Sequence, residues 1–420
     1  MKALKFCTSG FALVLVSALA TGCGPSKSVV VPEPAAPEAT MASESFEVRI
    51  TAQVPADAPQ VYLSGNLPEL GPWHPGAYKM DGSGSQRTAT LRVPAGHALQ
   101  YKVTAGSWER EGLGPSGTLM PAFTATVDMD MDLTAKIEGF RVDPRVHIEN
   151  WQGAQTKGDL VYWTDVTSPH LKSPRHVVTL LPPGYDAADD KRYKVIYMHD
   201  GQNLFDPRIA YTGIDWGVDE AMQRGVEKGE YEPAIIVGIW NTAERLLEYS
   251  PWHDGPKYTK FLLEELMPRV NAEFKVLSGP ENTFSMGSSM GGLMSFYLVQ
   301  NHPDVFGACG CVSSHITWSE QMIEWFMGRD PMQADPTPYL LKDVQAGATM
   351  PAGQRLYFDY GTKGLDAAYE APHLALRDWL LAQGYVEGEN LKMQRFDGDD
   401  HNEASWRARV DQQLSFLLSE

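Results

Sequence analysis

A serine with a glycine two residues to either side is the position in this sequence best suited to nucleophilic chemistry. Ser289 is the central residue of Gly287-Ser288-Ser289-Met290-Gly291, the G-x-S-x-G pattern of a nucleophile placed on a sharp turn. The apolar residues 283–286 predict a strand before it, and residues 291–301 predict a helix after it. Glycines permit such a turn, and a helix N-terminus stabilises negative charge. Ser289 is therefore the predicted nucleophile of an acyl transfer, whereas Ser288 falls at the wrong place in the pattern.

A serine hydroxyl needs a base, and hydrolases with this turn carry an acid and then a histidine later in the chain. Only His373 and His401 follow Ser289 with room for an acid between. His373 lies within a predicted helix, whereas His401 lies in a loop after the predicted strand 391–396. His401 is therefore the predicted general base.

The acid is expected on the loop that follows another predicted strand, residues 355–360. Asp366 lies on this loop and is the predicted partner of His401. Asp359 lies within the strand and Glu370 within the next predicted helix, so each is less well placed to orient the imidazole. A solvated surface aspartate is the alternative interpretation of Asp366.

Two backbone amides are expected to stabilise the oxyanion of the reaction. One is the amide of Met290, directly after the nucleophile. The other should come from the loop 199–204, which follows a predicted strand and contains Gly201, where the backbone can turn. We expect the second amide to belong to Gln202, with Asn203 as the alternative, and a plain turn is the structural alternative.

Length and charge limit the classes of protein that fit. The 420 residues suit about two domains, and 21% charged with 43% hydrophobic residues is a globular composition. The net charge of −18 argues against nucleic-acid binding and disfavours strongly anionic substrates. Asp128, Asp130 and Asp132 alternate with methionines, which predicts the exposed face of a strand and not a calcium loop. We expect neither a metal nor a cofactor.

The first residues have the pattern of an export signal. Residues 1–22 combine two lysines with the apolar stretch 11–20 and end in small residues before Cys23. This predicts a bacterial lipoprotein that is lipidated at Cys23 and attached to the cell envelope through its lipid anchor; ordinary secretion is the alternative. The body of the chain contains only Cys309 and Cys311, which share one face of a predicted strand and are expected to be buried free thiols.

The texture of the remaining chain predicts two domains. Residues 23–43 are rich in Pro, Ala, Ser and Glu and predict a tether. Residues 44–141 show short alternating segments broken by Gly and Pro, which predict an immunoglobulin-like β-sandwich. After a linker at 142–163, residues 164–420 alternate apolar strands with helical patterns. This predicts a mostly parallel sheet with helices on both faces.

The segments 197–206 and 287–292 resemble the esterase family that contains enterochelin esterases, feruloyl esterases and S-formylglutathione hydrolase. The resemblance extends from about residue 164 to the end of the chain. It implies a metal-independent α/β hydrolase that acts on acyl esters, with Ser289, Asp366 and His401 as the matching triad. Such a family spans many substrates. Further matches are Asn241-Thr242, Arg245, Glu248-Tyr249, His401-Asn402-Glu403 and Trp406.

The segments 61–73, 101–103 and 107–109 resemble a starch-binding-type carbohydrate-binding module. The resemblance implies that Trp73 and Trp108 are flat platforms for sugar rings. Core tryptophans of a linker-like immunoglobulin-type domain are the alternative interpretation, because aromatic residues in sandwiches are usually buried.

Together these features predict a serine ester hydrolase that acts through an acyl-enzyme. The neighbouring sugar-binding domain favours acyl groups on carbohydrate, and an enterochelin-like siderophore esterase is the closest alternative. An inactive carbohydrate-binding surface lipoprotein is an alternative of another class. The intact G-x-S-x-G turn and the late His401 argue against that alternative.

Overall fold

The computed structural model describes residues 45–71, 73–115, 120, 122–141, 156–326 and 331–419. The expected signal peptide, Cys23, the expected tether and residues 142–155 of the expected linker lie outside these ranges. Within them, no helix has both the length and the apolar character needed to span a bilayer.

Residues 45–140 fold into short strands with one covered face each. Their elements are β1 Ser45–Gln53, β2 Tyr62–Gly65, η1 Pro68–Leu70, β3 Tyr78–Lys79, β4 Gln86–Pro94, β5 His97–Thr104, η2 Trp108–Arg110, β6 Gly112–Leu113, β7 Phe123–Val127, β8 Met131–Lys136 and β9 Gly139–Phe140. In β4 every second residue is buried, which is the period of a half-buried strand. Among the described residues, β4-β1-β8 form a three-stranded sheet, β3-β2-β5-β7 a four-stranded sheet, and β6-β9 a short pair.

One apolar cluster joins the two larger sheets of this region. Val48 and Leu91 come from the first sheet, Leu63 and Val103 from the second, and all four are almost fully buried. Residues 45–140 therefore form a β domain with a shared core, and its immunoglobulin-like character stays a prediction. Only Asp132 of the three alternating aspartates lies in a strand; the other two lie in the connection between β7 and β8.

The second part of the chain is built on an eight-stranded sheet. Its strands are β10 Asp159–Val166, β11 Arg175–Leu181, β12 Lys194–His199, β13 Ala234–Ile239, β14 Thr283–Ser288, β15 Ala308–Val312, β16 Arg355–Tyr360 and β17 Leu391–Arg395. The order is β10-β11-β13-β12-β14-β15-β16-β17. The first two pairs are antiparallel and the remaining pairs are parallel. A mostly parallel sheet of this order fits an α/β hydrolase.

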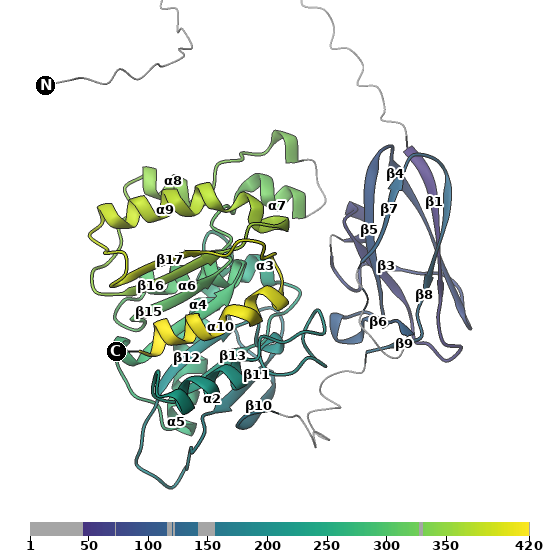
Figure 1. Cartoon of the computed structure of the whole chain (residues 1–420). Coiled ribbons are helices and arrows are strands. Elements are labelled where there is room, and N and C mark those ends of the chain that lie inside the picture. Colours follow the sequence, from purple (N-terminus) through teal and green to yellow (C-terminus); the bar gives the residue numbers. More distant parts are fainter. Residues whose placement is uncertain are drawn as a thin grey trace, which may run out of the picture. The chain divides into compact units, whose positions relative to one another are not determined.

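Helices cover both faces of this sheet (Figure 1). They are η4 Gly201–Asn203, α2 Val218–Lys228, α3 Arg245–Glu248, α4 Gly255–Lys260, η5 Phe261–Leu266, α5 Met267–Glu273, η6 Pro280–Asn282, α6 Met290–Asn301, α7 Glu320–Phe326, η7 Pro331–Gln333, α8 Tyr339–Gln345, η8 Gly364–Ala368, α9 Glu370–Ala382 and α10 Glu403–Leu418. In β12, Val195 and Tyr197 join the core under α5, α6 and α9, whereas Ile196 and Met198 join the core under α2 and α10. The inner strands β12 to β16 are buried on both faces, as expected for a parallel sheet.

The structure corrects one predicted domain boundary and one predicted helix. Strand β10 begins at Asp159 and pairs with β11, so the sheet starts within the segment 142–163 that was expected to be linker. This edge strand has only one fully buried residue, and its apolar run, residues 160–163, is short. The helix expected at 258–274 is present, but a π-helical segment, η5, interrupts it between α4 and α5. Cys309 and Cys311 are buried free thiols, as predicted.

Candidate active site

Ser289 lies on a tight turn between β14 and α6. Its backbone has φ 56° and ψ −121°, a strained conformation for a residue with a Cβ. A Cβ at Gly287 would lie 2.8 Å from the backbone carbon of Gly291, so a glycine at 287 is required for the two ends of the turn to approach, whereas a Cβ at Gly291 would lie 3.0 Å from Cβ of His199. The strand and the helix predicted around Ser289 are both present. The turn holds the serine at the carboxyl edge of the sheet.

The two neighbouring serines differ in their access to solvent. Ser289 is partly exposed, whereas Ser288 is 2% exposed. The backbone of Ser289 is fixed from both sides, because its N–H donates to the carbonyl of Val312 at 2.9 Å and its carbonyl accepts from the N–H of His315 at 3.0 Å. Ser289 is therefore the serine that a substrate could reach.

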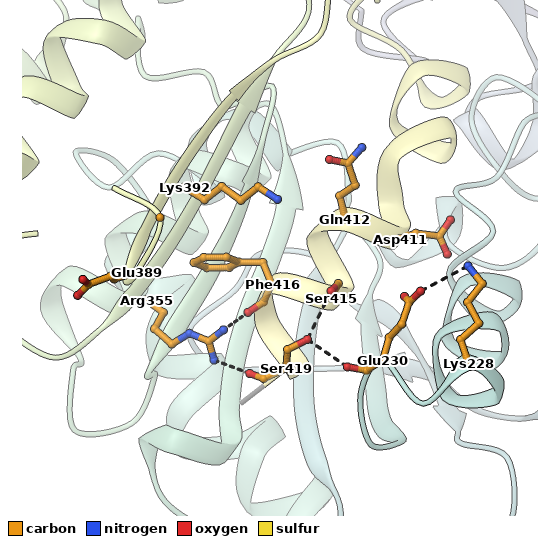
Figure 2. A pocket seen from close by; sticks show the side chains of 11 residues that line it. Lys228, Glu230, Arg355, Glu389, Lys392, Asp411, Gln412, Ser415, Phe416 and Ser419 are labelled. Atoms are coloured by element: carbon orange, nitrogen blue, oxygen red, sulfur yellow. Dashed lines mark hydrogen bonds and ion pairs between the residues drawn. The ribbon is translucent and has the colours of Figure 1, made fainter. Parts of the chain in front are cut away.

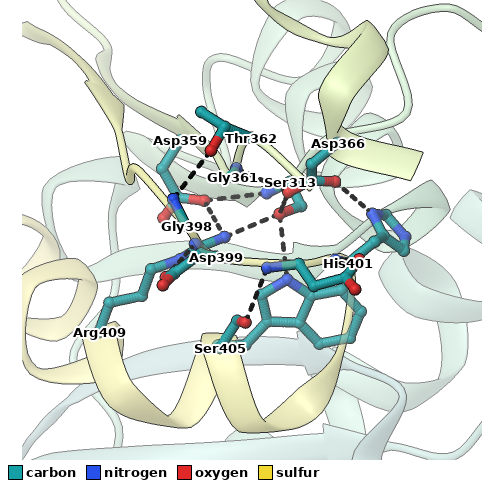
Figure 3. Close-up of polar contacts among 12 residues, drawn as sticks. Ser313, Asp359, Gly361, Thr362, Asp366, Gly398, Asp399, His401, Ser405 and Arg409 are labelled. Carbon is teal, nitrogen blue, oxygen red and sulfur yellow. Dashed lines mark hydrogen bonds and ion pairs between the residues drawn. The ribbon is translucent and has the colours of Figure 1, made fainter. Parts of the chain in front are cut away.

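The structure brings His401 and Asp366 together from two separate loops. Nδ1 of His401 lies 2.6 Å from Oδ1 of Asp366, across a separation of 35 residues in the chain (Figure 3). The other oxygen of Asp366, Oδ2, accepts hydrogen bonds from Ser313 Oγ at 2.5 Å and from the N–H of Gly361 at 2.7 Å. Because Asp366 engages Nδ1, Nε2 is the ring nitrogen that can take up a proton.

These contacts also set the charge of the acid. Burial raises the pKa of the Asp366 carboxyl, but hydrogen bonds from His401, Ser313 and Gly361 and the charge of His401 outweigh burial and leave the pKa below its ordinary value. Asp366 is therefore ionised at neutral pH and can stabilise a protonated imidazole.

The other candidate acids have different partners. Asp359 is fully buried and accepts from Arg409 at 2.9 Å and from Gln413 at 2.8 Å. Glu370 is exposed and pairs with Arg395 at 2.6 Å. Of the acids considered from the sequence, Asp366 alone has a described contact with His401.

Three other histidines near the sheet, His199, His315 and His373, are buried. Burial lowers the pKa to about 4 for His199, about 3 for His315 and about 4 for His373, so all three are neutral at pH 7. Nδ1 of each ring bonds a tyrosine oxygen: the hydroxyl of Tyr258, the hydroxyl of Tyr369 and the carbonyl of Tyr369, respectively. His401 differs from them because its side chain is 15% exposed.

The loop expected to supply the second oxyanion amide is the short helix η4 after β12. Gly201 packs so closely on β13 that a Cβ there would lie 2.4 Å from the backbone carbon of Gly238. The glycine is thus required for close approach, whereas the left-handed residue of the turn is Asp200 and not Gly201 as the sequence suggested. The amide of Asn203 donates to the carbonyl of Asp200 at 2.9 Å, so this amide has a partner within the loop. Gln202, the preferred candidate, is partly exposed, and the amide of Met290 lies in the first turn of α6.

Asp200 anchors this loop, a role that the sequence did not reveal. Its backbone is left-handed, with φ 59° and ψ 44°, and its side chain is buried. Its two oxygens each lie 2.7 Å from a nitrogen of Arg245, and Asn241 Nδ2 donates to Oδ1 at 2.6 Å. Burial opposes ionisation, but Arg245 and Asn241 together hold the pKa of Asp200 below its ordinary value. The family resemblance included Asn241 and Arg245 but gave them no role.

Replacing Asp200 with Asn should lower the free energy of unfolding by about 2 kcal/mol. Asparagine also adopts left-handed backbone, so the change chiefly removes the charge that faces Arg245. The loss should fall below that of a fully buried pair, because Arg245 is 24% exposed. Urea denaturation measures the difference. Asp254→Asn is the control, since its pair with Lys257 is exposed and should contribute less than about 1 kcal/mol. Equal losses in both variants would contradict this role for Asp200.

One group of carboxylates among the described residues has the spacing of a metal site: Asp215, Asp219 and Glu220. Arg407 already lies 2.7 Å from Asp215 and 3.1 Å from Glu220. Burial and the neighbouring Glu220 raise the pKa of Asp219 to about 7. Arg407 and the backbone N–H of Lys157, which donates to Asp219 at 2.8 Å, already occupy these carboxylates, so the cluster is a polar network that joins α10 to α2 and to the segment before α2.

A cavity of about 600 Å³ lies where β16 begins, at the edge of the sheet opposite to the one that holds Ser289 (Figure 2). Its lining includes Arg355, the first residue of β16, together with Phe416 and Ser419 near the end of α10. Ser289 and Asp366 instead follow the last residues of β14 and β16. Ligands of α/β sheets bind beyond the carboxyl ends of the strands, so this cavity is separate from the candidate active site.

Comparison with known proteins identifies one family. The sequence model of the family described as "Putative esterase" matches residues 168–417. The chain is 25% identical over 170 residues to the uncharacterized protein YbbA of Bacillus subtilis (strain 168), which is 37% of this chain and 63% of that protein. It is 37% identical over 86 residues to an alpha-amylase of Niallia circulans, which is 19% of this chain and 7% of the amylase. The chain thus spans less than two thirds of either relative.

The solved structures that match this chain include the following three. A ferulic acid esterase has a TM-score of 0.47 and 21% identity, covering 62% of this chain and 98% of its own. The enterochelin esterase of Shigella flexneri has a TM-score of 0.48 and 17% identity, covering 89% and 93%. The BES protein of Bacillus cereus has a TM-score of 0.45 and 19% identity, covering 64% and 98%.

Proposed function

We propose that this chain, which belongs to the esterase family whose sequence model it matches, hydrolyses carboxylic esters through an acyl-enzyme on Ser289. The observation that carries the proposal is the 2.6 Å contact between His401 and Asp366. These two side chains come from loops at the same edge of the sheet as the turn that holds Ser289. Serine, acid and histidine then have the roles of a catalytic triad.

In the proposed reaction, Ser289 Oγ attacks the ester carbonyl while Nε2 of His401 takes the serine proton. The amides of Met290 and Gln202 stabilise the negative charge that forms on the carbonyl oxygen. The C–O bond of the ester then breaks, and His401 returns the proton to the leaving alcohol. Water attacks the acyl-enzyme by the same route, which releases the carboxylic acid and restores Ser289. Asp366 keeps the proton on Nδ1 throughout and stabilises the imidazolium.

We propose an acylated carbohydrate as the substrate class. Support comes from the resemblance of residues 61–73, 101–103 and 107–109 to a starch-binding-type module and from the 86-residue similarity to an alpha-amylase. A domain that binds sugar would concentrate the enzyme on its substrate. The acyl group would then be an acetyl or feruloyl group on a polysaccharide.

An activity screen tests the proposal. Purified protein is assayed on p-nitrophenyl acetate and butyrate, on acetylated and feruloylated glycans, and on a catecholate siderophore ester. We expect turnover of the p-nitrophenyl esters, higher kcat/KM on acylated glycans, and labelling of Ser289 by a fluorophosphonate. A higher kcat/KM on the siderophore ester than on the acylated glycans would instead assign a siderophore ester as the substrate class. If the protein shows no turnover and no labelling of Ser289, the result would favour an inactive carbohydrate-binding protein.

Trp73→Ala or Trp108→Ala should weaken retention of the protein on insoluble α-glucan by about tenfold with little loss of stability. Both tryptophans are partly exposed, and Trp73 lies in a turn with φ 58°. An exposed ring can be truncated at low cost, whereas truncation of a buried tryptophan costs about 3 to 5 kcal/mol. The assay is a pull-down of the full chain with thermal unfolding measured alongside. Trp379→Ala in α9, also partly buried, is the control and should keep full retention. Unchanged retention in both variants would make the domain a spacer.

A further inference from the structure

Ser313 connects Asp366 to helix α10, and it is not one of the residues that carry out the proposed reaction. It follows β15 directly, its backbone has φ 39°, and its side chain is fully buried. Its hydroxyl lies within hydrogen-bonding distance of three side chains from two other elements: Asp366 in η8 and Arg409 in α10 (Figure 3), and also Trp406 in α10. A non-glycine residue held at positive φ is costly unless the surrounding structure fixes it.

The chemistry of the partners decides the direction of each hydrogen bond. Trp406 Nε1 and Arg409 Nη2 can only donate, and they lie 3.1 and 2.7 Å from Ser313 Oγ. A hydroxyl accepts two hydrogen bonds and donates one. Both acceptor positions of Ser313 are therefore taken. Its single proton is directed to Oδ2 of Asp366, 2.5 Å away.

Arg409 is itself fixed by a buried network. Nη2 lies 2.9 Å from Oδ1 of Asp359 and Nη1 lies 2.9 Å from Oδ2 of Asp399, while the guanidinium stacks on the ring of Phe396. The same Oδ1 of Asp359 accepts the backbone N–H of Ser313 at 3.0 Å. Arg409 and Asp359 are 2% and 0% exposed. The planar, multidentate guanidinium suits this bridging position, and water cannot easily compete with it.

We propose that Ser313 and Arg409 are positioning residues that fix the orientation of Asp366 toward His401. The inference rests on the proposed function, because it requires Asp366 to act on His401. Oδ2 of Asp366 is held by Ser313 and by the N–H of Gly361, which leaves Oδ1 facing the imidazole. Ser313 and Arg409 therefore act on the reaction through Asp366.

The hydrogen bond from Ser313 also limits how strongly Asp366 attracts a proton. Without it, the carboxylate becomes a stronger acceptor and rotates more freely. A stronger acceptor stabilises the protonated form of the base, so the base loses its proton at higher pH. Freer rotation lowers the fraction of molecules in the reactive geometry. The other titratable groups that interact with the side chain of His401 are Glu403, His315 and Tyr369, while Asp400 accepts from the backbone N–H of His401. Ser313→Ala replaces none of these groups.

The test compares Ser313→Ala with Ser314→Ala in the full chain. Ser314 is a matched control, because it is the next residue, it is also 0% exposed, and its hydroxyl has no hydrogen-bond partner in the described structure. We expect Ser313→Ala to lower kcat about tenfold with KM little changed. The acid limb of the kcat/KM profile should move up by roughly half a pH unit. Ser314→Ala should leave both unchanged.

Arg409→Lys is the second variant, for the case that Ser313→Ala does not fold. A lysine ammonium cannot bridge Asp359, Asp399 and the Ser313 hydroxyl as the guanidinium does, so kcat should again fall about tenfold at unchanged KM. Thermal unfolding and fluorophosphonate titration of Ser289 report the folded and reactive fraction of each variant.

Failure of the proposed function and failure of this inference give different results. If the parent protein shows neither turnover nor label at Ser289, the proposed function fails. If the parent is labelled but Ser313→Ala matches Ser314→Ala in kcat and in the acid limb, only the inference on Ser313 and Arg409 fails. A loss of stability in Ser313→Ala with both kinetic readouts unchanged also contradicts it, because the residue would then be merely structural.

Discussion

Ser289→Ala should lower kcat/KM on any ester that the protein hydrolyses by about a factor of 10⁶ and leave the protein folded. The hydroxyl is the only reacting group that the substitution removes. Alanine keeps the Cβ that the turn already accommodates at φ 56°. Hydrolysis of p-nitrophenyl butyrate, fluorophosphonate labelling and thermal unfolding together measure the effect. Labelling should disappear while the unfolding midpoint stays near that of the parent.

Ser288→Ala is the control for this experiment. Ser288 is the last residue of β14 and is 2% exposed, so its hydroxyl cannot reach a substrate as that of Ser289 can. Its removal should leave most of the activity. Retained activity in Ser289→Ala together with its loss in Ser288→Ala would reverse the assignment of the nucleophile.

The strand, turn and helix around Ser289 were predictable because adjacent residues determine them. The turn needs glycines at 287 and 291, an apolar strand before it and a helix after it, and all of these lie within residues 283–301. The alternation of apolar strands and helices in the same way predicted a mostly parallel sheet covered on both faces, which the structure has. Local periodicity carries this information directly.

The contacts that position the proposed triad could not be predicted from the sequence. Ser313 and Arg409 are separated by 96 residues and Asp200 and Arg245 by 45. Each pair meets only because the fold brings a residue that follows a strand, Ser313 or Asp200, next to a helix from a later part of the chain, α10 or α3. A serine after a strand has no local signature of such a role. An arginine within a helix is usually a solvated residue, so a buried Arg409 could not be distinguished by its position.

Helices α2 and α10 were not predicted, although both pack on the sheet. In α10 the buried residues include Arg409, Gln413 and Glu403, so its inward face is partly polar. An apolar stripe is the usual signal of a packed helix, and polar side chains that are satisfied by buried partners weaken it. The polar side chains that weakened the apolar pattern of α10 are the ones that form hydrogen bonds with Asp359 and Ser313.

Asp366→Asn should lower kcat by about a factor of 10⁴. In the parent, Oδ2 accepts from two donors, Ser313 Oγ and the N–H of Gly361. An amide NH₂ at that place would face both donors, so the asparagine would turn its oxygen toward them and its NH₂ toward His401. Nδ1 of His401 would then have to accept, its proton would move to Nε2, and Nε2 could no longer take the proton of Ser289.

The comparison is with Asp359→Asn and Glu370→Gln. Asp359 is bonded to Arg409 and Gln413 and reaches Asp366 only through Ser313, so its loss should cost less than about tenfold in kcat. Glu370 is exposed and pairs with Arg395, so its loss should leave kcat unchanged. Steady-state kinetics on p-nitrophenyl butyrate, with thermal unfolding of each variant, separates the three. If Asp359→Asn proved the most damaging, the acid of the triad would be Asp359, and the short contact between Asp366 and His401 would have only a structural role.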